Sequence, residues 1–146
     1  MSRREEALTV LVRAPAGVVY AALTDIDAWD TWWPGCASRR DPGADAEDPG
    51  ADHHLLRLPG GRRGLRCRAT VAGWRHDRGV RLVLRDGADA DAEWWLEPVA
   101  DGVVLHLLVT ARGRRAERTV RALGGGLQAL KDHLELAVDV AVGRVP

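Results

Sequence analysis

The chain has 146 residues, of which 46% are hydrophobic and 29% are charged, a balance that fits one soluble globular domain and excludes a disordered chain. Its 21 basic and 21 acidic side chains give a formal net charge of zero, which argues against nucleic acid as the main partner, since binding to phosphates favours a basic excess. No stretch approaches the roughly 18 apolar residues that a membrane span needs, and the N-terminus has no signal-peptide pattern. These features predict a single cytoplasmic domain over residues 1–146.

The first third of the chain predicts one strand and two short helices. Residues 7–13 alternate as a half-buried strand does, and residues 15–24 place apolar side chains at helical spacing. A second short helix is expected over 26–33, with Asp25 as its N-terminal cap. Residues 41–52 carry two proline turn signals and five acidic side chains, so they predict a loop.

The middle of the chain predicts a series of short strands separated by glycine-containing breaks. Breaks of this kind are typical of hairpins, so the sheet is expected to be antiparallel. A further strand can lie within 36–41. The five expected strands are 53–58, 64–74, 79–85, 91–98 and 102–111.

Residues 115–141 form the longest segment with helical periodicity, and their apolar positions make one stripe. Three consecutive glycines, Gly124–Gly126, interrupt it. Each glycine disfavours a helix by about 1 kcal/mol relative to alanine, so the sequence leaves two alternatives. Either the helix continues through the glycines, leaving an opening beside a pocket, or they form a loop between two helices.

The order of these elements predicts an α+β fold. A curved antiparallel sheet of six or seven strands would wrap round the long C-terminal helix, with the two short helices after the first strand. Such curling leaves a space between sheet and helix, which side chains fill or which remains as a pocket.

Several short motifs resemble the START-like (SRPBCC) superfamily of the polyketide cyclase/dehydrase type, in the order expected for that family. They are Ala14-Pro15-Ala16, Val19-Tyr20, Leu23-Thr24-Asp25, Trp32-Trp33-Pro34, Trp94-x-Leu96, Gly102-Val103 and the Leu127-to-Glu135 stretch. The resemblance spans nearly the whole chain and implies the helix-grip fold. Relatives with Trp-Trp-Pro tend to carry a histidine and a methionine early in the last helix. Ala116 and Val120 stand near those positions here, so no catalytic role is carried over.

Strand alternation indicates which side chains face the interior. Burying two unpaired carboxylates would be very unfavourable, so Glu93 and Glu97 are expected outside, with Trp94 and Leu96 inside. On strand 102–111 the odd-numbered set is expected to face inward. The resulting candidate ligand-binding residues are mostly apolar: Trp33, Trp94, Leu96, Leu105, Leu107, Leu127 and Tyr20. An interior that Trp33 and Trp94 fill solidly would contradict this prediction.

Polar residues give few candidates for chemistry. The two cysteines and five histidines show no metal-ligand spacing, so no metal and no cofactor are expected. Tyr20, Arg68 and His54 are weak candidates for acid–base work, and Arg68 qualifies only if the phase of its strand is reversed. The catalytic residues, if there are any, stay unknown.

Three hypotheses about function remain open. The first is binding of a small hydrophobic molecule, lipid-like or aromatic and polyketide-like, in an apolar cavity between sheet and C-terminal helix. The second is a polyketide aromatase/cyclase acting in the same cavity, and the third is a protein-interaction module as in the toxin-like branch of the superfamily. Strand 102–111 is apolar on both faces, which also allows a homodimer.

Overall fold

The structure is a computed structural model, and it describes residues 3–41 and 52–143. Its elements follow the predicted order, and the expected strand within 36–41 is present as β2. The loop predicted at 41–52 lies almost entirely outside the described residues. In chain order the elements are β1 (Arg3–Val12), α1 (Ala16–Thr24), the 3₁₀ helix η1 (Ile26–Thr31), β2 (Ala37–Arg40), β3 (His53–Leu58), β4 (Leu65–Arg75), β5 (Gly79–Arg85), β6 (Asp89–Val99), β7 (Gly102–Arg112) and α3 (Ala116–Ala141).

The seven strands form one antiparallel sheet in the order β1-β7-β6-β5-β4-β3-β2. Each strand from β2 to β6 is hydrogen-bonded to the next strand in sequence, as the hairpin signals predicted. Strand β1 instead pairs with β7, so the first and last strands of the chain are neighbours, and β1 and β2 form the two edges of the sheet. The prediction of a helix-grip α+β fold is therefore confirmed.

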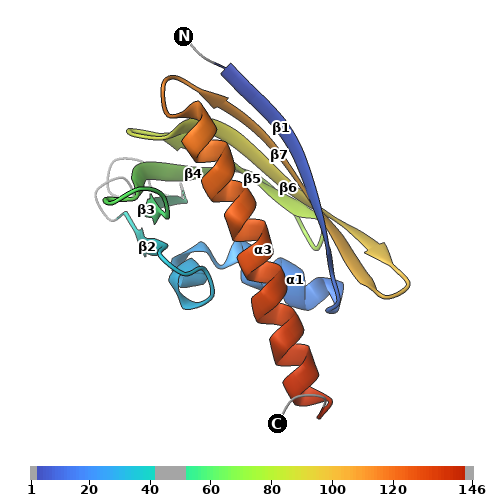
Figure 1. The fold of residues 1–146 in the computed structure, drawn as a ribbon. Coiled ribbons are helices and arrows are strands. Elements are labelled where there is room, and N and C mark those ends of the chain that lie inside the picture. The colour runs from blue at the N-terminus through green and yellow to red at the C-terminus, as the bar shows by residue number, and fades with distance from the viewer. Residues whose placement is uncertain (1–2, 42–51, 144–146) are drawn as a thin grey trace.

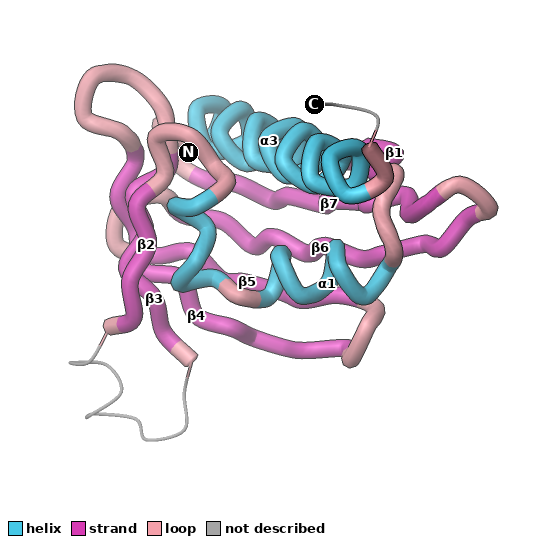
Figure 2. The backbone as a smooth tube through the Cα atoms, turned by 90° about the horizontal axis from the view of Figure 1, so that it is seen from below, coloured by secondary structure: helices cyan, strands magenta, loops and turns pink. Residues whose placement is uncertain are grey.

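Helix α3 lies along the concave side of the sheet, chiefly over β1 and β7 (Figure 1). Seen from below, the strands curve beneath α3 while α1 lies on the same side of the sheet (Figure 2). The helix η1 packs against β2. No helix among the described residues has the length and hydrophobicity that crossing a membrane requires.

The glycine run belongs to a continuous helix. Helix α3 extends from Ala116 to Ala141 without interruption, so the alternative of a loop at Gly124–Gly126 is wrong. The second short helix also differs in detail from its prediction, because it is a 3₁₀ helix and Asp25 makes no side-chain capping bond. Tertiary packing stabilises the helix through the glycines, since glycine itself disfavours a helix.

The inward faces of the strands agree with the predicted alternation. Trp94 and Leu96 are buried, whereas Glu97 on the same strand is exposed. Leu105 and Leu107 have no exposed surface at all, which confirms the inward odd-numbered face of β7. The described core contains aliphatic side chains from all of the longer strands and from one face of α3.

Candidate functional site

Four tryptophans meet between the sheet and helix α3. Trp29 lies at the centre, with ring centroids 6.1 Å from Trp32, 5.8 Å from Trp33 and 5.8 Å from Trp94. Trp32 and Trp33 stack with an interplanar angle of 8°. The turn after η1 makes this possible, because the Trp33 N–H donates to the Trp29 carbonyl and holds the chain in a compact bend.

The cluster fills most of the predicted interior cavity. The remaining gap has a volume of about 10 Å³, the space of about one water molecule at most. Its lining is apolar: Leu23, Trp29, Trp32, Trp33, Trp94, Leu123, Gly126, Leu127 and Leu130. Apolar side chains surround the space between sheet and helix as expected, but tryptophan rings fill it. The ligand-sized cavity predicted there is therefore absent from this structure.

A much larger hollow lies outside the cluster, and we call it the outer groove. It is open to solvent and has a volume of about 1020 Å³. Residues Thr31–Pro34 form one side, and Pro59–Gly61 form another. Helix α3 contributes Arg118, Arg121, Ala122, Gly125, Gln128, Ala129, Asp132, His133 and Leu136.

Trp32 and Trp33 separate the outer groove from the interior gap, since both line the two spaces. The glycines of α3 lie beside them. Gly125 faces the groove, and a Cβ there would contact nothing within 4 Å. Gly126 faces the interior, and its missing side chain leaves the room that the Trp33 indole occupies.

The Trp32 indole nitrogen is buried and finds no acceptor among the described residues. Trp29 shows the usual arrangement, because its indole N–H donates to the Leu23 carbonyl over 2.9 Å. A buried donor without a partner is unfavourable by about 1–3 kcal/mol. Trp32 therefore offers an unused donor at the boundary between the groove and the interior.

Polar groups on α3 border the groove. Arg118 donates to the Gly60 carbonyl over 3.3 Å and so joins the helix to the β3–β4 turn. Arg121, Asp132 and the exposed His133 line the same side. The groove thus combines an indole wall with a mixed polar rim, an arrangement common in small-molecule sites.

The structure places the predicted ligand-binding residues at different depths. Trp33 lines both the outer groove and the interior gap, whereas Trp94 and Leu127 line the interior gap but not the outer groove. The side chains of Leu96, Leu105 and Leu107 are buried in the core and border neither space. Tyr20 lies elsewhere, with its ring 5.8 Å from His76, and also borders neither space.

The weak candidates for catalysis do not come together. Arg68 points to the outer face of the sheet, where its guanidinium pairs with Asp41 at 3.0 Å and with Asp86 at 3.5 Å. The phase assigned to its strand from the sequence is therefore correct. Tyr20 and His54 are likewise absent from the lining of the outer groove and the interior gap.

His54 belongs to a buried polar cluster that the sequence pattern did not reveal. Its Nδ1 lies 2.6 Å from Asp27 Oδ1, and its Nε2 lies 2.5 Å from Asp52 Oδ1. Ionised carboxylates only accept hydrogen bonds, so both contacts are satisfied when both ring nitrogens carry hydrogens. The cluster connects η1 to the start of β3, which gives His54 a structural role. No signal in the sequence links Asp27 to a residue so distant in the chain.

Both cysteines are buried thiols. Burial raises the pKa of Cys36 to about 12, with a smaller contribution from Asp30, partly offset by Arg57. Burial also raises the pKa of Cys67 to about 12, and the nearby Cys36 adds to the shift. Since the thiolate is the nucleophile, neither side chain is suited to covalent catalysis at neutral pH.

Comparison with known proteins identifies both a family and a fold. The family model described as "Polyketide cyclase / dehydrase and lipid transport" matches residues 6–135. No curated protein matches the chain.

Several solved structures share the fold at low sequence identity. The Zhui aromatase/cyclase from Streptomyces sp. R1128 aligns with a TM-score of 0.77 and 17% identity, covering 96% of this chain and 98% of its own. A START superfamily protein from Mycobacterium smegmatis aligns with a TM-score of 0.72 and 15% identity, covering 91% of this chain and 98% of its own. A Polyketide_cyc-like protein from Corynebacterium glutamicum aligns with a TM-score of 0.60 and 18% identity, covering 94% and 95%. At these identities the likeness concerns the fold.

Proposed function

Because the chain belongs to the polyketide cyclase/dehydrase and lipid transport family, we propose that it binds a small, largely hydrophobic molecule in the outer groove, against Trp32 and Trp33. The volume of about 1020 Å³ is at the upper end of the range for small-molecule sites. Indole rings supply large apolar surfaces on which a flat ring or an acyl chain can pack.

The unpartnered Trp32 N–H is the observation that carries this proposal. A ligand with a keto or hydroxyl oxygen beside Trp32 would accept a hydrogen bond from this N–H. Binding would thereby remove the free-energy cost of a buried donor without an acceptor. We therefore assign the ligand to oxygen-bearing hydrophobic molecules, a class that includes aromatic polyketide-like compounds and fatty acids.

Access to the deeper gap depends on Trp33. Its indole closes the interior beside Gly126, so a ligand reaches Trp94 and Leu127 only when that indole moves toward the groove. Binding over the tryptophan pair needs a smaller movement, in which the buried Trp32 N–H turns toward the ligand in the groove. The proposal assigns the first contact to Trp32 and Trp33 and the deeper contacts to Trp94 and Leu127.

A cyclase reaction in the same place has less support. Ring closure of a poly-ketone needs acid–base groups beside the substrate. Tyr20, Arg68 and His54, the candidates from the sequence, do not line the groove. Asp132 and His133 of α3 do line it, but both are exposed and no hydrogen bond joins them among the described residues. The proposal is therefore binding, without an assigned reaction.

The test is to fill the groove without disturbing the core. Gly125→Leu places a leucine side chain into open groove space, whereas Ala137→Leu places the same side chain at an exposed position of α3 that does not line the groove. With 1-naphthol as the probe, followed by titration calorimetry, we expect Gly125→Leu to weaken binding by about tenfold or more. Ala137→Leu should leave the affinity unchanged. Equal affinity in the wild type and in a folded Gly125→Leu variant would exclude the outer groove as the site.

A further inference from the structure

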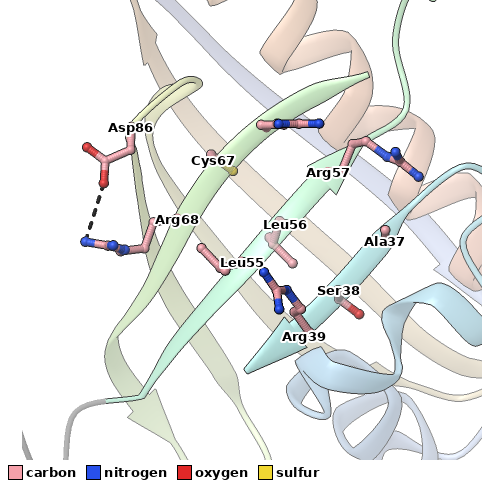
Figure 3. A pocket seen from close by; sticks show the side chains of 10 residues that line it. Ala37, Ser38, Arg39, Leu55, Leu56, Arg57, Cys67, Arg68 and Asp86 are labelled. Atoms are coloured by element: carbon pink, nitrogen blue, oxygen red, sulfur yellow. Dashed lines mark ion pairs between the residues drawn. The ribbon is translucent and has the colours of Figure 1, made fainter. Parts of the chain in front are cut away.

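A second hollow lies on the outer face of the sheet, over β2, β3 and β4, and we call it the arginine groove. Its volume is about 550 Å³, and Arg39, Arg57, Arg66 and Arg68 line it. Figure 3 shows Arg39, Arg57 and Arg68 arriving from three neighbouring strands around Leu55. Its lining shares no residue with that of the outer groove.

Two of these arginines stand directly opposite each other. Arg57 on β3 is the register partner of Arg66 on β4, and like charges in that position destabilise a sheet. Neither side chain has a carboxylate partner within residues 3–41 and 52–143. The fold alone gives no reason for this pair.

Other arginines of the sheet are neutralised. Arg85 lies 2.9 Å from Asp89, and Arg112 lies 3.0 Å from Asp91. Asp86, which lines the arginine groove, and Asp41, which does not, both pair with Arg68. The positive charge of Arg39, Arg57 and Arg66 is left without such compensation among the described residues.

The positive region continues beyond this groove. An adjoining hollow again includes Arg57 and Arg66, and it adds Arg62, Arg63 and Arg115. The formal net charge of the whole chain is zero, so this concentration is a local property of one face. One arginine guanidinium can donate hydrogen bonds to two phosphate oxygens at once. Several guanidinium groups around one hollow therefore favour a ligand with more than one negative charge.

We propose that the arginine groove binds a small phosphorylated organic molecule whose phosphate groups carry at least two negative charges. The guanidinium groups of Arg57, Arg66 and Arg39 would hold the phosphates, and Leu55 would contact the organic part. The volume of about 550 Å³ suits a small molecule better than an extended polymer. The site is separate from the hydrophobic groove, so either proposal can fail without the other.

The experiment follows backbone amide signals by NMR while inorganic pyrophosphate or adenosine diphosphate is added at constant ionic strength. The test variant is Arg57→Gln/Arg66→Gln. The control is Arg75→Gln/Arg78→Gln, which removes the same charge from exposed positions outside the arginine groove. Circular dichroism establishes that both variants fold.

We expect saturable shifts at residues of β2, β3 and β4 in the wild type and in the control. The Arg57→Gln/Arg66→Gln variant should lose about tenfold or more in affinity. The proposal is overturned by non-saturable shifts, by an equal loss in the control, or by binding of long polyanions such as heparin with none of pyrophosphate or adenosine diphosphate. If the test variant does not fold, the single variant Arg39→Gln replaces it in the titration. Its affinity for pyrophosphate or adenosine diphosphate should then fall below that of the wild type.

Discussion

Trp33 and Gly126 are packed so closely that a Cβ at position 126 would lie 2.8 Å from two carbons of the Trp33 indole. The contact explains why glycine occurs inside a long helix at this point. It also closes the interior of the protein, because Trp33 occupies the space that the missing side chain leaves. The three glycines of the run are therefore not equivalent.

Gly126→Ala is expected to destabilise the protein by up to about 2 kcal/mol. The gain in helix propensity of about 1 kcal/mol is outweighed by displacement of the indole, since overpacking a core is unfavourable by about 1–3 kcal/mol. Urea unfolding followed by far-UV circular dichroism measures this change. A Gly126→Ala protein more stable than the wild type would show that Trp33 moves aside freely.

Gly125→Ala is the matched substitution one residue earlier. A Cβ there meets nothing within 4 Å, so only helix propensity changes, and we expect stabilisation by about 1 kcal/mol. Loss of stability in Gly125→Ala would contradict the helical conformation at the glycine run.

Replacement of His54 by leucine is expected to destabilise the protein by about 1–2 kcal/mol. The change removes both hydrogen bonds of the buried imidazole, whereas Asp27 and Asp52 are partly exposed to water and Asp52 keeps Arg40 at 3.6 Å. His76→Leu is the control, because the His76 side chain is 90% exposed and its contact with Asp77 is 3.4 Å long. Thermal or urea unfolding compares the two, and similar small effects would mean that the buried cluster adds little to stability.

The buried cysteines predict a loss of stability in alkali. Below about pH 9 both thiols keep their protons in the folded and unfolded chain alike. Between pH 9.0 and about 12 the unfolded chain releases these protons while the folded chain retains them, so stability falls as pH rises. We expect the decline between about pH 8 and pH 10 to be smaller in Cys36→Ala/Cys67→Ala by about 2–3 kcal/mol, since each thiol contributes about 1.4 kcal/mol. Parallel pH profiles for the two proteins would contradict the raised pKa values.

The orientation of side chains on the strands was predictable because charge and burial conflict so strongly. Glu93 and Glu97 determined the phase of β6, and Trp94 then had to face inward. The same reasoning placed Arg68 on the outer face, where it is found. Alternation with a period of two carries this information locally, so no knowledge of the tertiary structure was needed.

The volume of the cavity was not predictable in this way. Whether Trp29, Trp32 and Trp33 line a space or fill it depends on the angles at which their rings pack, which the order of residues does not specify. The Gly126–Trp33 contact and the His54 cluster are also tertiary, joining residues far apart in the chain. Local propensity could therefore not decide between a helix and a loop at the glycines.

The most direct test of the ligand-binding site uses the indole N–H signals in a ¹⁵N-resolved NMR titration with 1-naphthol. Trp32 and Trp33 line the outer groove, whereas Trp74 and Trp95 are exposed and border a different hollow. We predict saturable shifts of the Trp32 and Trp33 signals, with the larger change at Trp32 as its N–H gains an acceptor, and no change at Trp74 and Trp95. Shifts confined to Trp74 and Trp95, or no saturable shift at any indole, would contradict the proposed binding site.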